Sequence, residues 1–167
     1  AAIAEALSRA GASLFLTARS ENGLHSTRQR LAALGGAAEC ASADVTIEAD
    51  VKRVVEQAYT TYGRLDILIN CAGIGIFGPF LQTSTADWDR IMATNVRGPF
   101  LFCREVITLM AKNGRRCIVN IASVVGVKEY INQSAYTASK HALMGLTKVL
   151  AQEVQPLGIR VHIVCPG

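Results

Sequence analysis

The chain has 167 residues, of which 50% are hydrophobic and 18% charged, and its formal net charge is +4. A chain of this length and apolar content buries a sizeable core, which excludes a disordered protein. Its basic residues are spread along the sequence, so we expect no nucleic-acid partner. Since no uninterrupted apolar stretch approaches the roughly 20 residues of a membrane span, we expect no membrane-spanning segment.

The cysteines and the first residues indicate a cytoplasmic protein. The number of cysteines is odd and their spacing wide, without a Cys-x-x-Cys pair: Cys40, Cys71, Cys103, Cys117 and Cys165. This pattern favours reduced core cysteines over a disulfide framework, and we expect no metal site. Residues 1–10 carry Glu5 and Arg9 and lack the charged start and apolar block of a signal peptide.

Helical and strand-like segments alternate through the first half of the chain. Residues 1–10 have a helical period of apolar residues, and residues 13–17 and 38–43 are short apolar stretches typical of strands. Ser20 is a candidate N-cap for a helix that ends near Gly35, and Thr46 is a candidate start for a helix through Tyr62.

The second half continues the alternation. The pattern predicts strands at 66–70, 117–121 and 159–164, and helices at 88–110 and 134–155. Continuous apolar strands separated by amphipathic helices are typical of a parallel sheet with helices on both faces. We therefore expect a single α/β domain over residues 1–167, with a Rossmann-like doubly wound sheet.

The most informative pair of residues is Tyr136 and Lys140. Positions i and i+4 lie on one face of a helix, so a phenol and an ammonium group can point into one site. A phenol is a poor acid or base at neutral pH, but a neighbouring ammonium group favours the phenolate. Alone the pair is weak evidence, because it also occurs as an ordinary contact on a surface helix.

Ser123 strengthens this interpretation. It follows the predicted strand 117–121, and ligands of open parallel sheets bind at the carboxyl ends of the strands. A serine hydroxyl there can donate a hydrogen bond to a substrate carbonyl oxygen, although a loop or capping serine is the ordinary alternative.

Four motifs together resemble the short-chain dehydrogenase/reductase family. Asn70-Cys-Ala-Gly73 resembles its Asn-Asn-Ala-Gly motif, with Cys71 in place of the second Asn, and Asn95-Val-Arg-Gly98 is similar to its Asn-hydrophobic-x-Gly motif. Ser123, Tyr136 and Lys140 match the spacing of the family's active-site residues. Pro166-Gly167 matches its Pro-Gly turn beside the nicotinamide.

The resemblance implies a catalytic role for four residues. Tyr136 would be the general acid/base at the substrate oxygen, and Lys140 would favour the phenolate of Tyr136 and hydrogen-bond the nicotinamide ribose. Ser123 would hold the substrate oxygen, and Asn95 would support a water that relays protons through Lys140.

The resemblance also implies a set of cofactor-binding residues. Asp44 and Val45 would contact the adenine, whereas Asn70, Ala72 and Gly73 would pack against the adenosine side. Tyr136 and Lys140 would lie at the nicotinamide end, together with Pro166 and Gly167.

The end of strand 13–17 bears on the choice of cofactor. In related sheets an acidic residue at this place binds the 2′-hydroxyl of NAD, and an arginine accommodates the 2′-phosphate of NADP. This chain has Ala18-Arg19 and no carboxylate before Glu21. We therefore expect Arg19 to bind the 2′-phosphate and NADP(H) to be preferred over NAD(H).

The sequence departs from the family at its ends. Residues 1–7 resemble the helix that follows the glycine-rich pyrophosphate turn, so the first strand and that turn are not part of the sequence, and it ends at the Pro-Gly turn. We expect strands 13–17 and 66–70 to lack one neighbour each, because the family's first strand is central in the sheet. We also expect the isolated 167-residue chain to be poorly folded, to bind NADP weakly and to have doubtful activity.

Three functional hypotheses follow. The first is an NADP(H)-dependent carbonyl reductase or alcohol dehydrogenase, and the second is a non-catalytic fragment or binding remnant of such an enzyme. A sugar-nucleotide epimerase or dehydratase also uses a Tyr-x-x-x-Lys pair, but residues 70–73 and Pro166-Gly167 argue against it.

Substrate and assembly are less constrained. Loops 75–85 and 124–132 would line the substrate pocket, and their apolar residues suggest a moderately apolar carbonyl compound or alcohol. Helices 88–110 and 134–155 match those that pair subunits in the family, which implies a homotetramer or homodimer.

Overall fold

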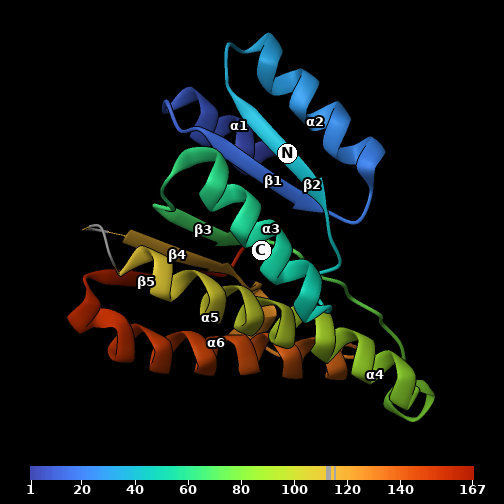
Figure 1. Cartoon of the computed structure of the whole chain (residues 1–167). Helices are drawn as coiled ribbons and strands as arrows, with labels where there is room; N and C mark the ends of the chain where they lie inside the picture. Colours follow the sequence, from blue (N-terminus) through green and yellow to red (C-terminus); the bar gives the residue numbers. More distant parts are fainter. Residues whose placement is uncertain (112–113, 115) are drawn as a thin grey trace.

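The computed structural model describes residues 1–111, 114 and 116–167 and has helices and strands in alternation (Figure 1). The strands are β1 (Leu14–Ala18), β2 (Ala38–Ser42), β3 (Ile67–Asn70), β4 (Arg116–Ile121) and β5 (Ile159–Val164). The main helices are α1 (Ala2–Arg9), α2 (Glu21–Ala33), α3 (Glu48–Tyr62), α4 (Thr85–Met92), α5 (Gly98–Met110) and α6 (Ser134–Val154). The order of elements is the predicted one, with bounds shifted by a few residues.

Side-chain hydrogen bonds determine where α2 and α3 begin. Ser20 caps α2 as predicted, since its Oγ accepts from the Gly23 amide at 3.2 Å. The predicted start of the next helix at Thr46 is wrong, because α3 begins at Glu48. The Thr46 amide and hydroxyl both donate to Asp44 Oδ1, at 2.9 and 2.7 Å, and this turn delays the helix.

The helix predicted over residues 88–110 is divided. Its first part, α4, begins at Thr85 with Ser84 as N-cap, and a π-helical turn over Ala93–Arg97 separates α4 from α5. Pro99 lies in the first turn of α5 and has no N–H, so it cannot donate to the carbonyl of Asn95 as a regular helix requires. The interruption therefore falls on one of the predicted site residues.

The strands form two parallel sheets. β1 pairs with β2, and β3, β4 and β5 pair in that order. Among the described residues no pairing joins β1 to β3, and a cavity of about 950 Å³ lies between them, bordered also by α1 and α5. The predicted interruption of the sheet between these two strands is confirmed. Although α1 has an apolar face, it buries none of its residues, and its face borders this cavity.

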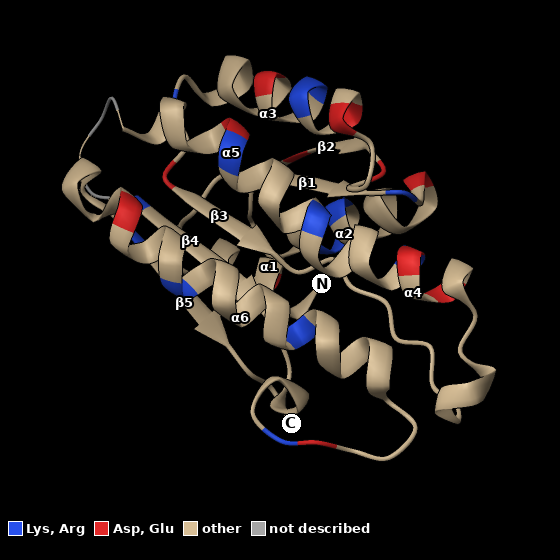
Figure 2. Cartoon of the chain, turned by 90° about the horizontal axis from the view of Figure 1, so that it is seen from below, with Lys and Arg blue, Asp and Glu red and all other residues tan. Residues whose placement is uncertain are grey.

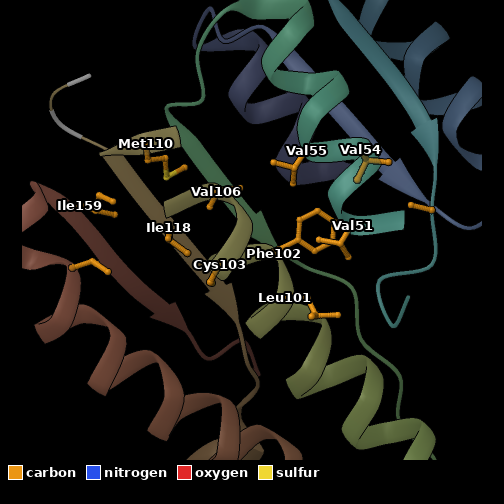
Figure 3. Packing of buried hydrophobic residues seen from close by; sticks show 12 residues of the cluster. Val51, Val54, Val55, Leu101, Phe102, Cys103, Val106, Met110, Ile118 and Ile159 are labelled. Carbon is orange, nitrogen blue, oxygen red and sulfur yellow. The ribbon is translucent and has the colours of Figure 1, made fainter. Parts of the chain in front are cut away.

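The main hydrophobic cluster lies between helices α3, α5 and α6 and the sheets (Figure 3). It combines residues of α3 and α5 with those of the strands and α6, chiefly Val51, Val54, Val55, Leu101, Phe102, Val106, Met110, Ile118, Val154 and Ile159. Val51, Met110 and Ile118 are fully buried. Burial of one such side chain contributes about 1.5–3 kcal/mol, so this cluster anchors α5 and α6 to the strands.

Exposure alternates along β5, where Ile159 is buried and Arg160, His162 and Val164 are exposed. The described helices α1 and α2 contact β1 and β2, and α5 and α6 contact β3, β4 and β5. The expected α/β fold of parallel strands covered by helices is confirmed.

The cysteines are free thiols, as expected, but most are not core residues. Only Cys103 is buried, and burial raises the pKa of its thiol to about 12. Cys71 is exposed, because it directly follows β3. Apolar neighbours in the sequence therefore do not imply burial where a strand ends.

Acidic and basic residues are interspersed over the helices (Figure 2). Many form exposed pairs within or between helices, such as Arg104 with Glu48 at 2.7 Å. Within the described part of the chain, no helix is both long and apolar enough to cross a membrane.

A chain of buried polar side chains links the sheet to α6. Asn70 Nδ2 donates to Asn120 Oδ1 at 2.8 Å, and Asn120 Nδ2 donates to Thr147 Oγ1 at 2.9 Å. The Thr147 hydroxyl in turn donates to the Leu143 carbonyl at 2.7 Å. All three polar side chains are buried, so the loss of one partner leaves another without a hydrogen bond.

We predict that Thr147→Val destabilises the fold by about 1–3 kcal/mol, because the buried Asn120 amide loses its acceptor while the side-chain volume is kept. Thr147→Ser is the control, since it retains the hydroxyl. Denaturant unfolding of both variants measures the effect, and equal stabilities of the Val and Ser variants would contradict the assignment.

The cavity between the sheets predicts a pattern of hydrogen exchange in the 167-residue chain. The Leu14 amide donates to Ala37 toward β2, and alternate residues of a parallel strand face the same side, so the amides of Phe15 and Thr17 face the cavity. By the same rule Ile67 and Ile69 face it from β3. These four amides should exchange faster than those of Leu16 and Leu68, and β4 should exchange slowest because it is bonded on both edges.

Exchange followed by NMR or mass spectrometry tests this pattern. Equal protection of the two alternating sets would show that the cavity-facing amides have partners in solution.

Candidate active site

Tyr136 and Lys140 lie one turn apart at the start of α6. Lys140 Nζ is 5.6 Å from the centroid of the Tyr136 ring, so the phenol and the ammonium group share one face of the helix, as the spacing predicts. Both side chains border a pocket of about 280 Å³. The pocket lies beyond the carboxyl ends of β3 and β4 and has this lining: Cys71, Gly73, Ile74, Gly75, Phe77, Ile121, Ala122, Tyr136 and Lys140.

Lys140 is buried and held in place. Its side chain is 4% exposed, and Nζ donates to the carbonyl of Ile121 at the end of β4, at 3.0 Å. Burial lowers the pKa of Lys140, and nearby Cys71 and Cys165 act in the opposite direction. An ammonium group has three N–H donors, so this one bond leaves donors for groups that enter the pocket.

Ser123 follows the end of β4, as the sequence predicts. Its Oγ accepts from the Val125 amide at 3.4 Å, so this serine caps the short helical turn Val124–Gly126. The neighbouring Val124 amide donates to the Pro166 carbonyl at 2.7 Å. This bond joins the Ser123 loop to Pro166 and Gly167 beyond β5.

Asn95 is fully buried and connects three elements. Its amide oxygen accepts from the Ile74 amide, and its Nδ2 donates to the Ile74 carbonyl, both at 2.9 Å. Nδ2 also donates to Ser139 Oγ at 3.0 Å, and Ser139 donates to the Tyr136 carbonyl at 2.7 Å. The π-helical turn is thereby joined to the loop after β3 and to the turn of α6 that carries Tyr136 and Lys140.

The two glycines of the matched motifs differ in their packing. A side chain at Gly98 would begin 3.0 Å from Val45 Cγ2, so this glycine lets the loop after β2 lie against α5. A Cβ atom at Gly73 would lie 3.4 Å from Asn95 Oδ1 and 3.5 Å from Lys140 Nζ, which are ordinary contact distances, and it would occupy space beside the ammonium group.

The residues predicted for the adenine and phosphate end lie after β1 and β2. Arg19 is exposed and makes no salt bridge within the described part of the chain. Hydrogen bonds from the Thr46 amide and hydroxyl lower the pKa of Asp44, with a smaller contribution from the charge of Arg19. The two side chains thus lie within electrostatic reach of each other, where the 950 Å³ cavity meets Ala18 and Val45.

Asn70 has a different environment from Ala72 and Gly73. Its side chain points into the core, where it donates to Asn120, whereas Ala72 and Gly73 are exposed. Ala72 borders the larger cavity and Gly73 the smaller pocket, and Cys71 borders both. The two hollows are therefore adjacent at the end of β3.

Sequence reasoning missed Ile74 and Ser139, whereas Phe77 belongs to loop 75–85, which was expected to line the substrate pocket. Ile74 binds Asn95 through its backbone alone, which no side-chain pattern indicates. Ser139 directly precedes Lys140 and is fully buried, and a serine at a buried helix position is the signal that could have identified it. Phe77 packs edge-on against Tyr136, with ring centroids 5.5 Å apart.

No cluster of three or more His, Cys, Asp or Glu side chains suited to a metal ion occurs in the described ranges.

The sequence is similar to known oxidoreductases along its whole length. Residues 1–167 match the family model described as short chain dehydrogenase. The 3-oxoacyl-[acyl-carrier-protein] reductase of Bos taurus is 38% identical over 99% of this chain and 69% of its own length. An uncharacterized oxidoreductase of Thermotoga maritima is 40% identical over 94% of this chain, which spans 62% of that protein's length.

Solved structures agree with this assignment. A metagenomic short-chain oxidoreductase in complex with NADP superposes with a TM-score of 0.94 at 35% identity, over 99% of this chain and 76% of its own. A short chain dehydrogenase/reductase from Burkholderia phymatum in complex with NAD gives 0.89 at 30% identity, over 92% and 56%. The chain belongs to the short-chain dehydrogenase/reductase family.

Proposed function

We propose that the protein carrying this chain is an NADP(H)-dependent oxidoreductase that interconverts a carbonyl compound and an alcohol. The observation that carries the proposal is the Tyr136–Lys140 pair on α6, with Lys140 buried and both side chains at one pocket. An epimerase or dehydratase has no comparable support, because the family match covers the whole chain. Nothing in the comparisons favours the non-catalytic alternative over the enzyme.

The residues present fit the nicotinamide end of a dinucleotide. Gly73 leaves open the space beside Lys140 Nζ, and that ammonium group has N–H donors beyond the one used by Ile121. Lys140 would hold the nicotinamide ribose, with Pro166 and Gly167 beside the ring and Ala72 and Gly73 along the adenosine side. When bound, the nicotinamide supplies or accepts a hydride.

The protein's own residues manage the substrate oxygen. Tyr136 gives its phenolic proton to the oxygen during reduction and takes it back during oxidation. The Ser123 hydroxyl donates a hydrogen bond to the same oxygen, which orients the carbonyl carbon. The charge of Lys140 stabilises the phenolate left on Tyr136, and its burial strengthens that interaction because solvent screening is weak there.

Asn95 has a supporting role in this proposal. Its carbonyl lacks the N–H donor that a regular helix would supply, because residue 99 is proline. That carbonyl would hold a water molecule that returns protons through Lys140. The Asn95 side chain is already engaged by Ile74 and Ser139, so it keeps the turn in position.

Arg19 supports the preference for NADP(H). It follows β1 without a neighbouring carboxylate in sequence and makes no salt bridge within the described residues, so its guanidinium group can receive a 2′-phosphate. Asp44 and Val45 would contact the adenine from the loop after β2.

Exposed apolar side chains on the helices support a homo-oligomer. Phe100 on α5 is 43% exposed and Val149 on α6 is 57% exposed. We infer that these helices contribute to the contact between subunits of a dimer or tetramer.

We predict that Tyr136→Phe in the full-length protein lowers kcat by at least about 10²–10⁴-fold and leaves the Kd for NADPH nearly unchanged, because only proton transfer is lost. Tyr59→Phe, on α3 and away from the pocket, is the matched control. Steady-state kinetics and NADPH fluorescence titration measure the two quantities. Retention of more than about a tenth of the activity would show that Tyr136 is not the acid/base.

The preference for NADP(H) gives a second prediction for the full-length protein. Ala18→Asp should reverse the preference, because its carboxylate repels the 2′-phosphate and can accept from the 2′-hydroxyl of NAD. Arg19→Ala should lower kcat/KM for NADPH by about tenfold and change that for NADH little. The six kcat/KM values, for three proteins with two cofactors each, decide this, and equal use of both cofactors by the unmodified protein would refute the assignment of Arg19.

A further inference from the structure

Phe77 lies at the mouth of the pocket that contains Tyr136 and Lys140. It belongs to the loop after β3, and its ring meets the Tyr136 ring edge-on, with centroids 5.5 Å apart and an interplanar angle of 84°. Although it packs against Tyr136, Phe77 is 59% exposed. A large aromatic ring is thus held open to solvent directly beside the phenol.

The position of this ring depends on Gly75. A Cβ atom at residue 75 would lie 2.5 Å from Phe77 Cζ and 2.9 Å from Cε1, distances that no real contact reaches. The ring therefore lies against the α-carbon of Gly75, and any other residue would push it away.

The loop itself is fastened to the approach to α6. The Gly78 amide donates to the carbonyl of Asn132 at 2.9 Å, two residues before α6 begins. Asn132 has a left-handed backbone conformation, with φ of 66°, which asparagine tolerates better than most residues. Phe77 is thus held on one side by Gly75 and on the other by the bond from its neighbour Gly78.

The pocket beside the open ring has apolar side chains on one part of its wall and the polar groups of Tyr136 and Lys140 on another. Ile74, Ile121 and Ala122 line the same pocket, and Lys140 is its one lysine or arginine within the described lining. A flat apolar group against Phe77 would leave water and gain an aromatic contact, which a small polar group would not gain.

We propose that Phe77, seated on Gly75, is the specificity-determining wall of the active site and selects ketones and secondary alcohols with an aryl or cycloalkyl substituent. This inference rests on the proposed function, since the carbonyl group must be held at Tyr136 and Ser123 for its substituent to reach the ring. Phe77 touches the substituent and takes no part in proton transfer.

Two methyl ketones test the proposal in the full-length protein with NADPH. Acetophenone carries a phenyl substituent, and hydroxyacetone carries a polar one. Phe77→Ala should lower kcat/KM for acetophenone by about 10- to 100-fold, mainly through KM, and that for hydroxyacetone by less than about threefold. Gly75→Ala should give the same split although the phenyl ring is kept, because the new methyl group displaces it.

Phe80→Ala is the matched control, since Phe80 is 73% exposed on the next turn of chain and does not line the pocket. It should leave both ketones unaffected. An equal loss for both ketones in Phe77→Ala would overturn the proposal and assign Phe77 to the positioning of Tyr136, and no change for either ketone would also overturn it.

Binding of acetophenone, followed by saturation-transfer NMR, separates this inference from the proposed function. Binding that weakens in Phe77→Ala without any turnover by the unmodified protein would support the apolar wall and refute the oxidoreductase activity. Turnover with no effect of Phe77→Ala on binding would refute the wall and leave the activity intact. Neither binding nor turnover would refute both.

Discussion

The geometry of the active site depends on the buried amide of Asn95. One side chain binds both backbone groups of Ile74 and the hydroxyl of Ser139, so the π-helical turn, the loop after β3 and the first turns of α6 form one unit. A buried amide that loses such partners costs about 1–3 kcal/mol, which makes any other arrangement unfavourable. Tyr136 and Lys140 share this unit because Ser139 also binds the Tyr136 carbonyl.

A second buried network acts one layer deeper. Asn70, Asn120 and Thr147 connect the ends of β3 and β4 with the middle of α6. The apolar cluster supplies most of the burial free energy, but apolar contacts have little directional preference, whereas hydrogen bonds fix register and orientation. The helix that carries Tyr136 and Lys140 is therefore anchored by apolar contacts and aligned by polar ones.

Glycines allow close contacts at three places around the site. Gly98 receives Val45, Gly73 keeps space open beside Lys140, and Gly75 receives the ring of Phe77. Gly98 and Gly73 lie where segments distant in sequence meet, whereas Gly75 and Phe77 belong to the same loop. These contacts place the loops after the strands around Tyr136 and Lys140, and binding residues commonly lie on loops positioned by a rigid scaffold.

The sequence alone determined the order of elements, the parallel strands and the Tyr136–Lys140 pair, because apolar periodicity and i, i+4 spacing are local properties. It also identified the Asn95 and Ser123 positions through their motifs. Only the tertiary structure decided that Asn70 turns into the core, that Arg160, His162 and Val164 of β5 are exposed, and that Phe77 meets Tyr136. These features arise from contacts between segments far apart in the chain, and no local pattern encodes them.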